Sequence, residues 1–283
     1  MKKIILSADS TCDLNDELKN LYNVNYYPYS IILDGNEYKD NVDISPKDIY
    51  ETYYEKKILP KTAAINIAEY YNHFKPWIDQ GHEVIHINLG SAITSAYNNC
   101  TIAAKELGNI YPIDSHNLSS GSGLLVLKAA DMINEGLSAK EITEKLNEHR
   151  DKIHVSFVLD TLDFLHAGGR CSKLSSLGSN LLKIKPCIEV DNGSGAMGLG
   201  NKYRGNLSKV LVKYINDQLS KYKNINKEYM FITHSGIDDE YIDIAKKTIL
   251  ELVDFRKIYV TTASCTISSH CGPNTLGIIF ETV

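Results

Sequence analysis

A loop rich in hydroxyl groups opens a predicted helix in the first third of the chain. In the segment I-H-I-N-L-G-S-A-I-T-S-A-Y, an apolar run breaks at Leu89-Gly90 and is followed by Ser91, Thr94 and Ser95. The first turn of a helix offers free backbone N–H groups and the positive end of the helix dipole, so a carboxylate or a phosphate can be bound there. A helix cap needs only one hydroxyl. These residues alone predict either an anion-binding site or a cap, in equal measure.

Thr62 and Arg170 are further candidates for contact with an anion. Thr62 follows Pro60-Lys61 and can act as a helix N-cap or as a hydroxyl donor to a ligand. Taken alone, the cap is the preferred interpretation. Arg170 follows Gly168-Gly169, which is typical of a helix end, and the side chain could face a cleft. A lone arginine is more often solvated or ion-paired, so the pattern favours that simpler role.

His270 lies in the segment S-S-H-C-G-P-N-T, in a turn predicted directly before the last strand. A histidine in that setting contacts a polar ligand or fulfils a structural hydrogen bond. Its neighbour Cys271 raises the alternative of thiol catalysis, but adjacent residues rarely face each other as nucleophile and base. Two other strand-end loops, D-S-T-C-D-L at residues 9–14 and I-D-S at residues 113–115, favour caps and tight turns, with the role of Ser115 left open.

Short apolar runs alternate with amphipathic stretches along the whole chain, which predicts an α/β fold. Ligands of such folds bind at the C-terminal ends of strands or between domains, where the candidate residues lie. The predicted strands are Lys3–Ala8, Val24–Leu33 with a possible interruption, Glu83–Asn88, Asn109–Ile113, Ile153–Leu159, Cys187–Val190, Glu228–Thr233, Lys257–Thr262 and Leu276–Thr282.

Helix signals and one change of pattern divide the chain. Ser45-Pro46 and the capping box at Ser138 predict helix starts, and a helix beginning near Gly205 has one apolar face. A charged helix gives way to an apolar run near Arg150–His154. We therefore expect two α/β domains, residues 1–152 and 153–283. The glycine-rich stretch from Asp191 to Gly200 predicts a hairpin loop.

Composition excludes several classes of protein. The 283 residues carry a net charge of −5 with acids and bases interspersed, so nucleic acid is not an expected partner. The apolar run near the N-terminus is too short for a signal peptide, and no stretch is long enough to span a membrane. Six cysteines without metal-ligand spacing predict free thiols and a cytoplasmic location. Walker A, G-x-S-x-G and H-E-x-x-H motifs do not occur, and we expect no metal and no cofactor.

The order of these loops resembles that of the bacterial DegV family over essentially the whole chain. The matching motifs are D-S-T-C-D-L, K-T before a helix, the Ser/Thr loop ending in A-Y, I-D-S, L-x-x-L-x-x-G-G-R, K-P-C-I and S-H-C-G-P-N-T-L-G. The resemblance implies two α/β domains with one long-chain fatty acid held between them. It also implies that the protein is a lipid-binding subunit, not an enzyme by itself, that presents the carboxylate to an ATP-dependent fatty acid kinase subunit for phospholipid synthesis. It allows for transient membrane contact.

The resemblance also implies roles for individual residues. Thr62 and Thr94 would bind the carboxyl group, Arg170 and His270 would lie near it where the kinase approaches, and Ser91 and Ser95 are secondary candidates. The chain departs from the family pattern in several places. Thr94 replaces the usual serine, Ala63 to Asn66 replace the polar S-Q-P-S, Asn274 stands for glycine, and Cys171 stands for isoleucine.

Three other functions stay open at this level. The first is a stand-alone hydrolase or acyltransferase using Cys271 or Ser95. The second is a carrier or sensor for another small amphiphile, without a kinase. The third is a polyol-kinase subunit, because such dihydroxyacetone-binding proteins have a similar architecture. A narrow apolar slot would exclude the third function, and a short polar pocket would support it.

Overall fold

The computed structural model describes residues 3–170 and 184–283. Within them the chain forms an α/β fold, as predicted, and its strands make three sheets. The first sheet has the order β2-β1-β6-β7 and is entirely parallel. Its strands are β1 (Ile4–Asp9), β2 (Asn25–Tyr27), β6 (Glu83–Asn88) and β7 (Ile110–Asp114). Because crossover helices cover both faces of a parallel sheet, β1 and β6 are buried along most of their length.

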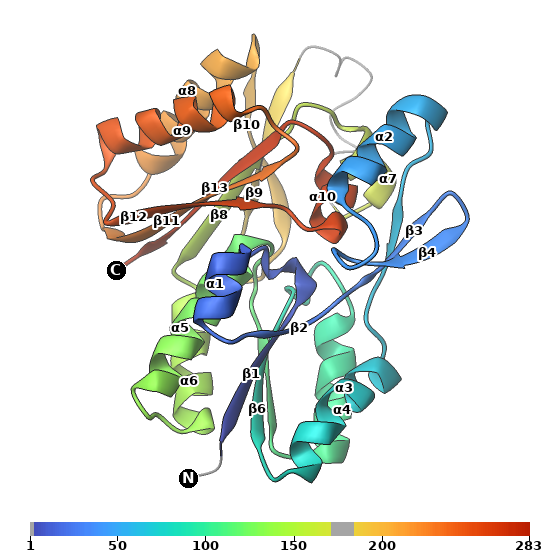
Figure 1. The fold of residues 1–283 in the computed structure, drawn as a ribbon. Helices are drawn as coiled ribbons and strands as arrows, with labels where there is room; N and C mark the ends of the chain where they lie inside the picture. Colours follow the sequence, from blue (N-terminus) through green and yellow to red (C-terminus); the bar gives the residue numbers. More distant parts are fainter. Residues whose placement is uncertain (1–2, 171–183) are drawn as a thin grey trace.

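Helices lie on both sides of this first sheet. α3 (Ile67–Asp79) and α4 (Ala96–Leu107) pack together on one side, and α5 (Ser120–Asn134) and α6 (Ala139–Arg150) on the other (Figure 1). The capping box at Ser138 is confirmed at the start of α6. The short elements η1 (Ser10–Cys12) and α1 (Asp16–Leu21) follow β1.

The second sheet has six strands in the order β10-β9-β8-β13-β11-β12. They are β8 (Ile153–Val158), β9 (Lys185–Val190), β10 (Met197–Tyr203), β11 (Ile225–Ser235), β12 (Lys257–Thr262) and β13 (Thr275–Thr282). α8 (Leu207–Leu219) and α9 (Asp239–Leu252) pack together over its outer face, and the predicted apolar face of α8 is confirmed. The predicted hairpin loop joins the antiparallel strands β9 and β10.

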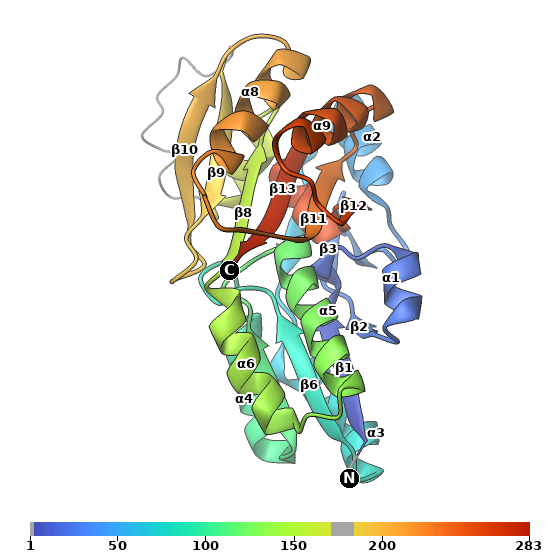
Figure 2. The ribbon, with the colours of Figure 1, turned by 90° about the vertical axis from the view of Figure 1, so that its left-hand side faces the viewer.

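One apolar core joins the two large sheets. Figure 2 shows the six-stranded sheet above the first sheet, with the start of α5 close to both. α5 contacts β8 and β13, and a single buried cluster includes Leu6 and Ile87 of the first sheet together with Phe157, Phe231 and Ile279 of the second. The chain passes from one sheet to the other between Arg150 and Ile153. The division into residues 1–152 and 153–283 stays a prediction.

The third sheet is small and antiparallel, with the order β4-β3-β5. Its strands are β3 (Ser30–Leu33), β4 (Asn36–Lys39) and β5 (Lys61–Ala63), and α2 (Pro46–Lys56) lies between β4 and β5 in the sequence. A buried cluster joins this sheet and α2 to α7 (Asp163–Gly168) and α10 (Cys265–Cys271). The N-terminal half therefore contributes a layer that packs against helices from the C-terminal half.

The interruption allowed for within Val24–Leu33 is present, because β2 and β3 belong to different sheets. Two local predictions were wrong. Thr62 is not a helix cap: it lies in β5 opposite Ile31, and Asn66 caps α3 with Glu69 as the capping-box partner. His270 lies in the last turn of α10 and not in a Gly-Pro turn. No helix within residues 3–170 and 184–283 is both long enough and apolar enough to cross a membrane.

Candidate functional site

A cavity lies where α7, α10, β5 and the loop after β6 meet. It contains about 530 Å³ of space between atoms, including its opening. Most of its wall is apolar, and the polar side chains in it include Thr62, Thr94, Arg170 and His270. The remaining wall residues are Tyr29, Ala64, Leu89, Ile93, Leu118, Phe157, Leu165, Met197, Thr266, Ile267 and Cys271. We call this space the first cavity.

A second cavity adjoins the first and contains about 330 Å³ of space. The two cavities share Leu118, Phe157, Ile267 and Cys271 as wall residues. The second cavity also has several serine and threonine residues in its wall, but their hydroxyl groups are bonded within the protein. Ser235 donates to Ser268, Thr275 donates to the backbone oxygen of Cys271, and Ser119 donates to Asp13. The surface left for a ligand is therefore mainly apolar.

Thr62 and His270 come from distant parts of the chain and meet at the first cavity. Thr62 Oγ1 lies 2.9 Å from His270 Nε2, within hydrogen-bonding distance. Burial, followed by the positive charge of Arg170, lowers the pKa of His270 to about 4. The imidazole is thus neutral near pH 7 and can donate one N–H. His270 Nδ1 is buried without a hydrogen-bond partner among the described residues and lies against Gly168.

Arg170 and Thr94 complete the polar part of this wall. Arg170 Nη1 donates to the backbone oxygen of Gly168 at 2.7 Å, which holds the exposed guanidinium next to the end of α7. Gly169 has φ +65° and ends that helix, as predicted. Thr94 lies just before α4, where its Oγ1 accepts a hydrogen bond from the backbone N–H of Ala96 at 3.3 Å. Burial raises the pKa of Tyr29, and a hydrogen bond from the Thr94 side chain partly opposes that rise, so the Thr94 hydroxyl is engaged with Tyr29.

The two secondary candidates do not line either cavity. Ser95 is exposed and its side chain does not cap α4. Ser91 is held through its backbone N–H, which donates to Asp114 at 3.0 Å. The structure therefore brings together four of the six predicted site residues, and it leaves Ser91 and Ser95 outside the cavity wall. Their predicted contact with a ligand stays a prediction.

Two polar residues in the wall of the first cavity, Tyr29 and Thr266, were not predicted from the sequence. The Tyr29 hydroxyl donates to the buried Asp9 at 3.4 Å, and Thr266 Oγ1 donates to Asp40 at 2.7 Å. Both hydroxyl groups therefore support the wall. Thr266 belongs to a cysteine- and serine-rich stretch that carries no local signal of a cavity wall. Tyr29 follows Pro28, and only its contact with a distant carboxylate identifies it.

The cysteine in this wall is held in its protonated form. Burial raises the pKa of Cys271 to about 12, so its thiol is protonated near neutral pH. The five cysteines within the described ranges are buried free thiols, whereas Cys171 lies outside the described residues. No group of three or more His, Cys, Asp or Glu side chains in residues 3–170 and 184–283 could hold a metal ion.

A family model described as an uncharacterised protein of the DegV family matches residues 3–283. A DegV domain-containing protein of Clostridium perfringens is 32% identical over 289 residues, which cover 99% of this chain and 98% of that protein.

Two solved structures have the same fold. One, from Thermus thermophilus and described as fatty acid binding of a DegV family protein, has a TM-score of 0.89 and 24% identity, covering 99% of this chain and 100% of its own. The other, from Eubacterium ventriosum and described as a stearic acid-binding protein, has a TM-score of 0.82 and 25% identity, covering 99% and 98%.

Proposed function

The chain belongs to the DegV family, and from this membership we propose that it binds one long-chain fatty acid. The acyl chain would occupy the first and second cavities, and the carboxyl group would lie beside Thr62, Thr94 and His270. Related proteins described as binding fatty acids support this proposal. The observation that carries it is the first cavity itself, whose apolar wall has hydroxyl and imidazole groups gathered in it.

The energetics of the two parts of the ligand fit such a wall. Removing about 14 methylene groups from water gains roughly 11 kcal/mol, at about 0.8 kcal/mol for each group. An unpaired carboxylate would cost several kcal/mol on burial, so it needs hydrogen-bond donors and a nearby cation. Thr62 and Thr94 supply hydroxyl donors, His270 orients the Thr62 hydroxyl through their shared hydrogen bond, and Arg170 supplies the cation. The hydrocarbon would provide affinity and the polar groups would fix the orientation.

We further propose that the bound acid is presented to an ATP-dependent fatty acid kinase subunit, which converts it to an acyl phosphate. Arg170 supports this role because its side chain is exposed to solvent and also belongs to the wall of the first cavity. A partner could therefore contact Arg170 without entering the cavity. In this scheme the protein does no free-standing chemistry, which agrees with the protonated state of Cys271.

Native mass spectrometry of delipidated protein reloaded with palmitic acid tests the proposal. We expect one acid per chain. Thr62→Val and Thr94→Val keep the side-chain shape and lose a donor, so each should weaken binding roughly tenfold or more. Arg170→Ala should weaken binding less than either valine variant, because the guanidinium is exposed to solvent, and it should support less acyl phosphate formation when the kinase and ATP are added.

The control is Thr101→Val, because the Thr101 hydroxyl bonds only the backbone oxygen of Tyr97 in α4. Failure of the unchanged protein to take up any fatty acid would end the proposal. Equal loss of binding in the Thr62, Thr94 and Arg170 variants would refute the division into binding and presenting residues.

A further inference from the structure

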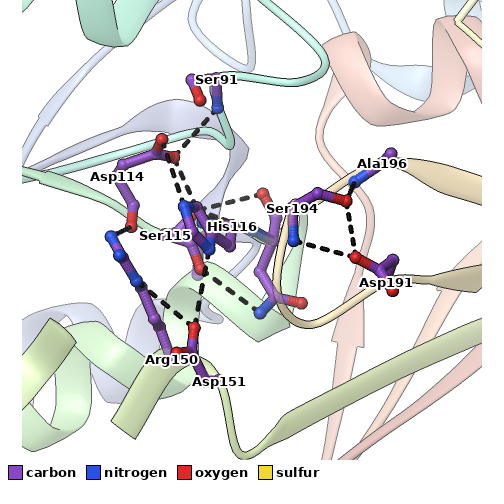
Figure 3. Close-up of polar contacts among 11 residues, drawn as sticks. Ser91, Asp114, Ser115, His116, Arg150, Asp151, Asp191, Ser194 and Ala196 are labelled. Carbon is purple, nitrogen blue, oxygen red and sulfur yellow. Dashed lines mark hydrogen bonds and ion pairs between the residues drawn. The ribbon is translucent and has the colours of Figure 1, made fainter. Parts of the chain in front are cut away.

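Asp114 ends β7 in the I-D-S motif, and the proposed binding of the acid leaves this buried carboxylate without a role. Its side chain is only 9% exposed. One oxygen, Oδ1, accepts hydrogen bonds from two backbone N–H groups, that of Ser91 at 3.0 Å and that of His116 at 3.2 Å (Figure 3). Asp114 therefore ties the loop that follows β6 to the loop that follows β7.

The first of these loops carries part of the cavity wall. Ile93 and Thr94 lie two and three residues after Ser91 and line the first cavity. A second tie supports the same loop, because the backbone N–H of Gly90 donates to the backbone oxygen of Asn117 at 2.9 Å. A side chain at Gly90 would meet the Asn117 backbone at 3.0 Å, so the two loops are in close contact. The position of Thr94 thus depends on what holds Gly90 and Ser91.

Other groups surround this junction without reaching the loop of Thr94. The His116 ring lies between two carboxylates, with Nε2 3.6 Å from Asp114 and Nδ1 3.6 Å from Asp151. On its other side is the β9–β10 turn, where a side chain at Gly195 would meet the His116 backbone at 2.9 Å. Figure 3 shows this turn, marked by Asp191 and Ser194, beside His116. Asp151 is 55% exposed in its side chain and makes no described bond to residues 90–95, so it provides a matched control.

We propose that Asp114 is a positioning residue: by accepting the Ser91 N–H it sets the Thr94 hydroxyl at the place where the ligand carboxyl group is bound. This inference rests on the proposed function of Thr94. The acceptor oxygen matters here and not the negative charge. Asparagine at position 114 keeps an Oδ1 acceptor, and its amide group would face His116 Nε2, which can accept a hydrogen bond. Asp114→Asn should therefore behave like the unchanged protein, whereas Asp114→Ala should not.

The test compares the binding of palmitic acid and of hexadecanol, which have the same chain length and different polar ends. In Asp114→Ala the loop should lose its position, and palmitic acid binding should weaken about tenfold, which is the scale of one hydrogen bond to a charged group. Hexadecanol binding should change less than about twofold. Asp114→Asn and the control Asp151→Ala should keep the palmitic acid to hexadecanol ratio within about threefold of the unchanged protein.

A double-mutant cycle with Thr94→Val decides whether Asp114 acts through Thr94. In the Thr94→Val background, Asp114→Ala should weaken palmitic acid binding by less than about twofold more. Equal losses for both ligands, or independent effects that multiply in the double variant, would overturn the inference. If Thr94→Val alone leaves palmitic acid binding unchanged, the proposed role of Thr94 fails instead. If Asp114→Ala does not fold, Asp114→Ser, whose shorter side chain cannot reach the Ser91 N–H, replaces it with the same expectations.

Discussion

The position of the His270 ring depends on the absence of a side chain at Gly168. A Cβ atom there would overlap His270 Nδ1, and the ring is held on its other side by Thr62. The backbone of Gly168 is helical and has no positive φ, so its glycine is explained by this contact and not by conformational freedom. The G-G-R motif thus combines two separate requirements, space at Gly168 and a left-handed turn at Gly169.

Gly168→Ala should therefore displace His270 from Thr62. We expect fatty acid binding to weaken by roughly tenfold, together with about 1 to 3 kcal/mol of lost stability from overpacking. Displacement of a fluorescent fatty acid and urea unfolding measure the two effects. Gly198→Ala is the control, because the nearest atom to a Cβ at that position is 3.8 Å away. Normal binding by Gly168→Ala would show that the ring has room to move without loss.

At the scale of elements, Asn66 provides the N-cap of α3, so Thr62 is not needed as a cap. The Asn66 side chain accepts a hydrogen bond from the Glu69 N–H at 3.0 Å, and the Glu69 carboxylate accepts one from the Asn66 N–H at 2.9 Å. Because this capping box satisfies the helix start, Thr62 is free to extend β5 and face the cavity.

Asn66→Ala should lower the free energy of unfolding by about 1 kcal/mol, the usual value of an N-cap. Fatty acid affinity should change little, since Asn66 does not line the cavity. Asn66→Ser should retain most of the stability, because serine is also a good cap. Urea unfolding monitored by circular dichroism provides the comparison. A larger loss of stability in Thr62→Val than in Asn66→Ala would contradict this assignment of the cap.

Local signals of this kind explain which parts could be predicted from the sequence. Ser45 and Ser138 were read correctly as helix starts because each capping box closes within four residues. Thr62 was misread because its strand is defined by pairing with Ile31, which no local pattern reveals. Likewise, Ser91 and Thr94 look equivalent in the sequence. In the structure Thr94 lines the first cavity, whereas Ser91 is held by its backbone N–H, which donates to the distant Asp114.

For the molecule as a whole, buried histidines predict a dependence of stability on pH. Burial is the largest cause that lowers the pKa of His73 to about 3 and those of His154 and His270 to about 4. In an unfolded chain histidine has a pKa of about 6.5. Between about pH 6.5 and 4 the unfolded state therefore binds more protons than the folded state, and the free energy of unfolding falls as the pH falls.

His154→Gln should make this fall shallower between pH 6.5 and 4. Urea unfolding at several pH values measures it, and His166→Gln, at an exposed position, is the control. The Asp13 carboxyl has the opposite effect on the pH dependence of stability. Burial raises its pKa to about 7, so its contribution to the free energy of unfolding is lost as the pH rises toward 7. An unchanged pH profile in His154→Gln would mean that His154 titrates alike in both states.

The order of the strands also bears on how the protein forms during synthesis. β13, built from residues 275–282, lies between β8 and β11 and not at an edge of its sheet. The backbone N–H groups of Ser264 and Cys265 bond the carboxylates of Asp13 and Asp40, more than 200 residues earlier. On the ribosome, the first sheet can assemble while the rest is still being translated, but the wall that carries His270 cannot. The proposed capture of a lipid therefore has to wait until residues 264–282 have been translated. Until then, the apolar faces of earlier segments are exposed and must avoid aggregation.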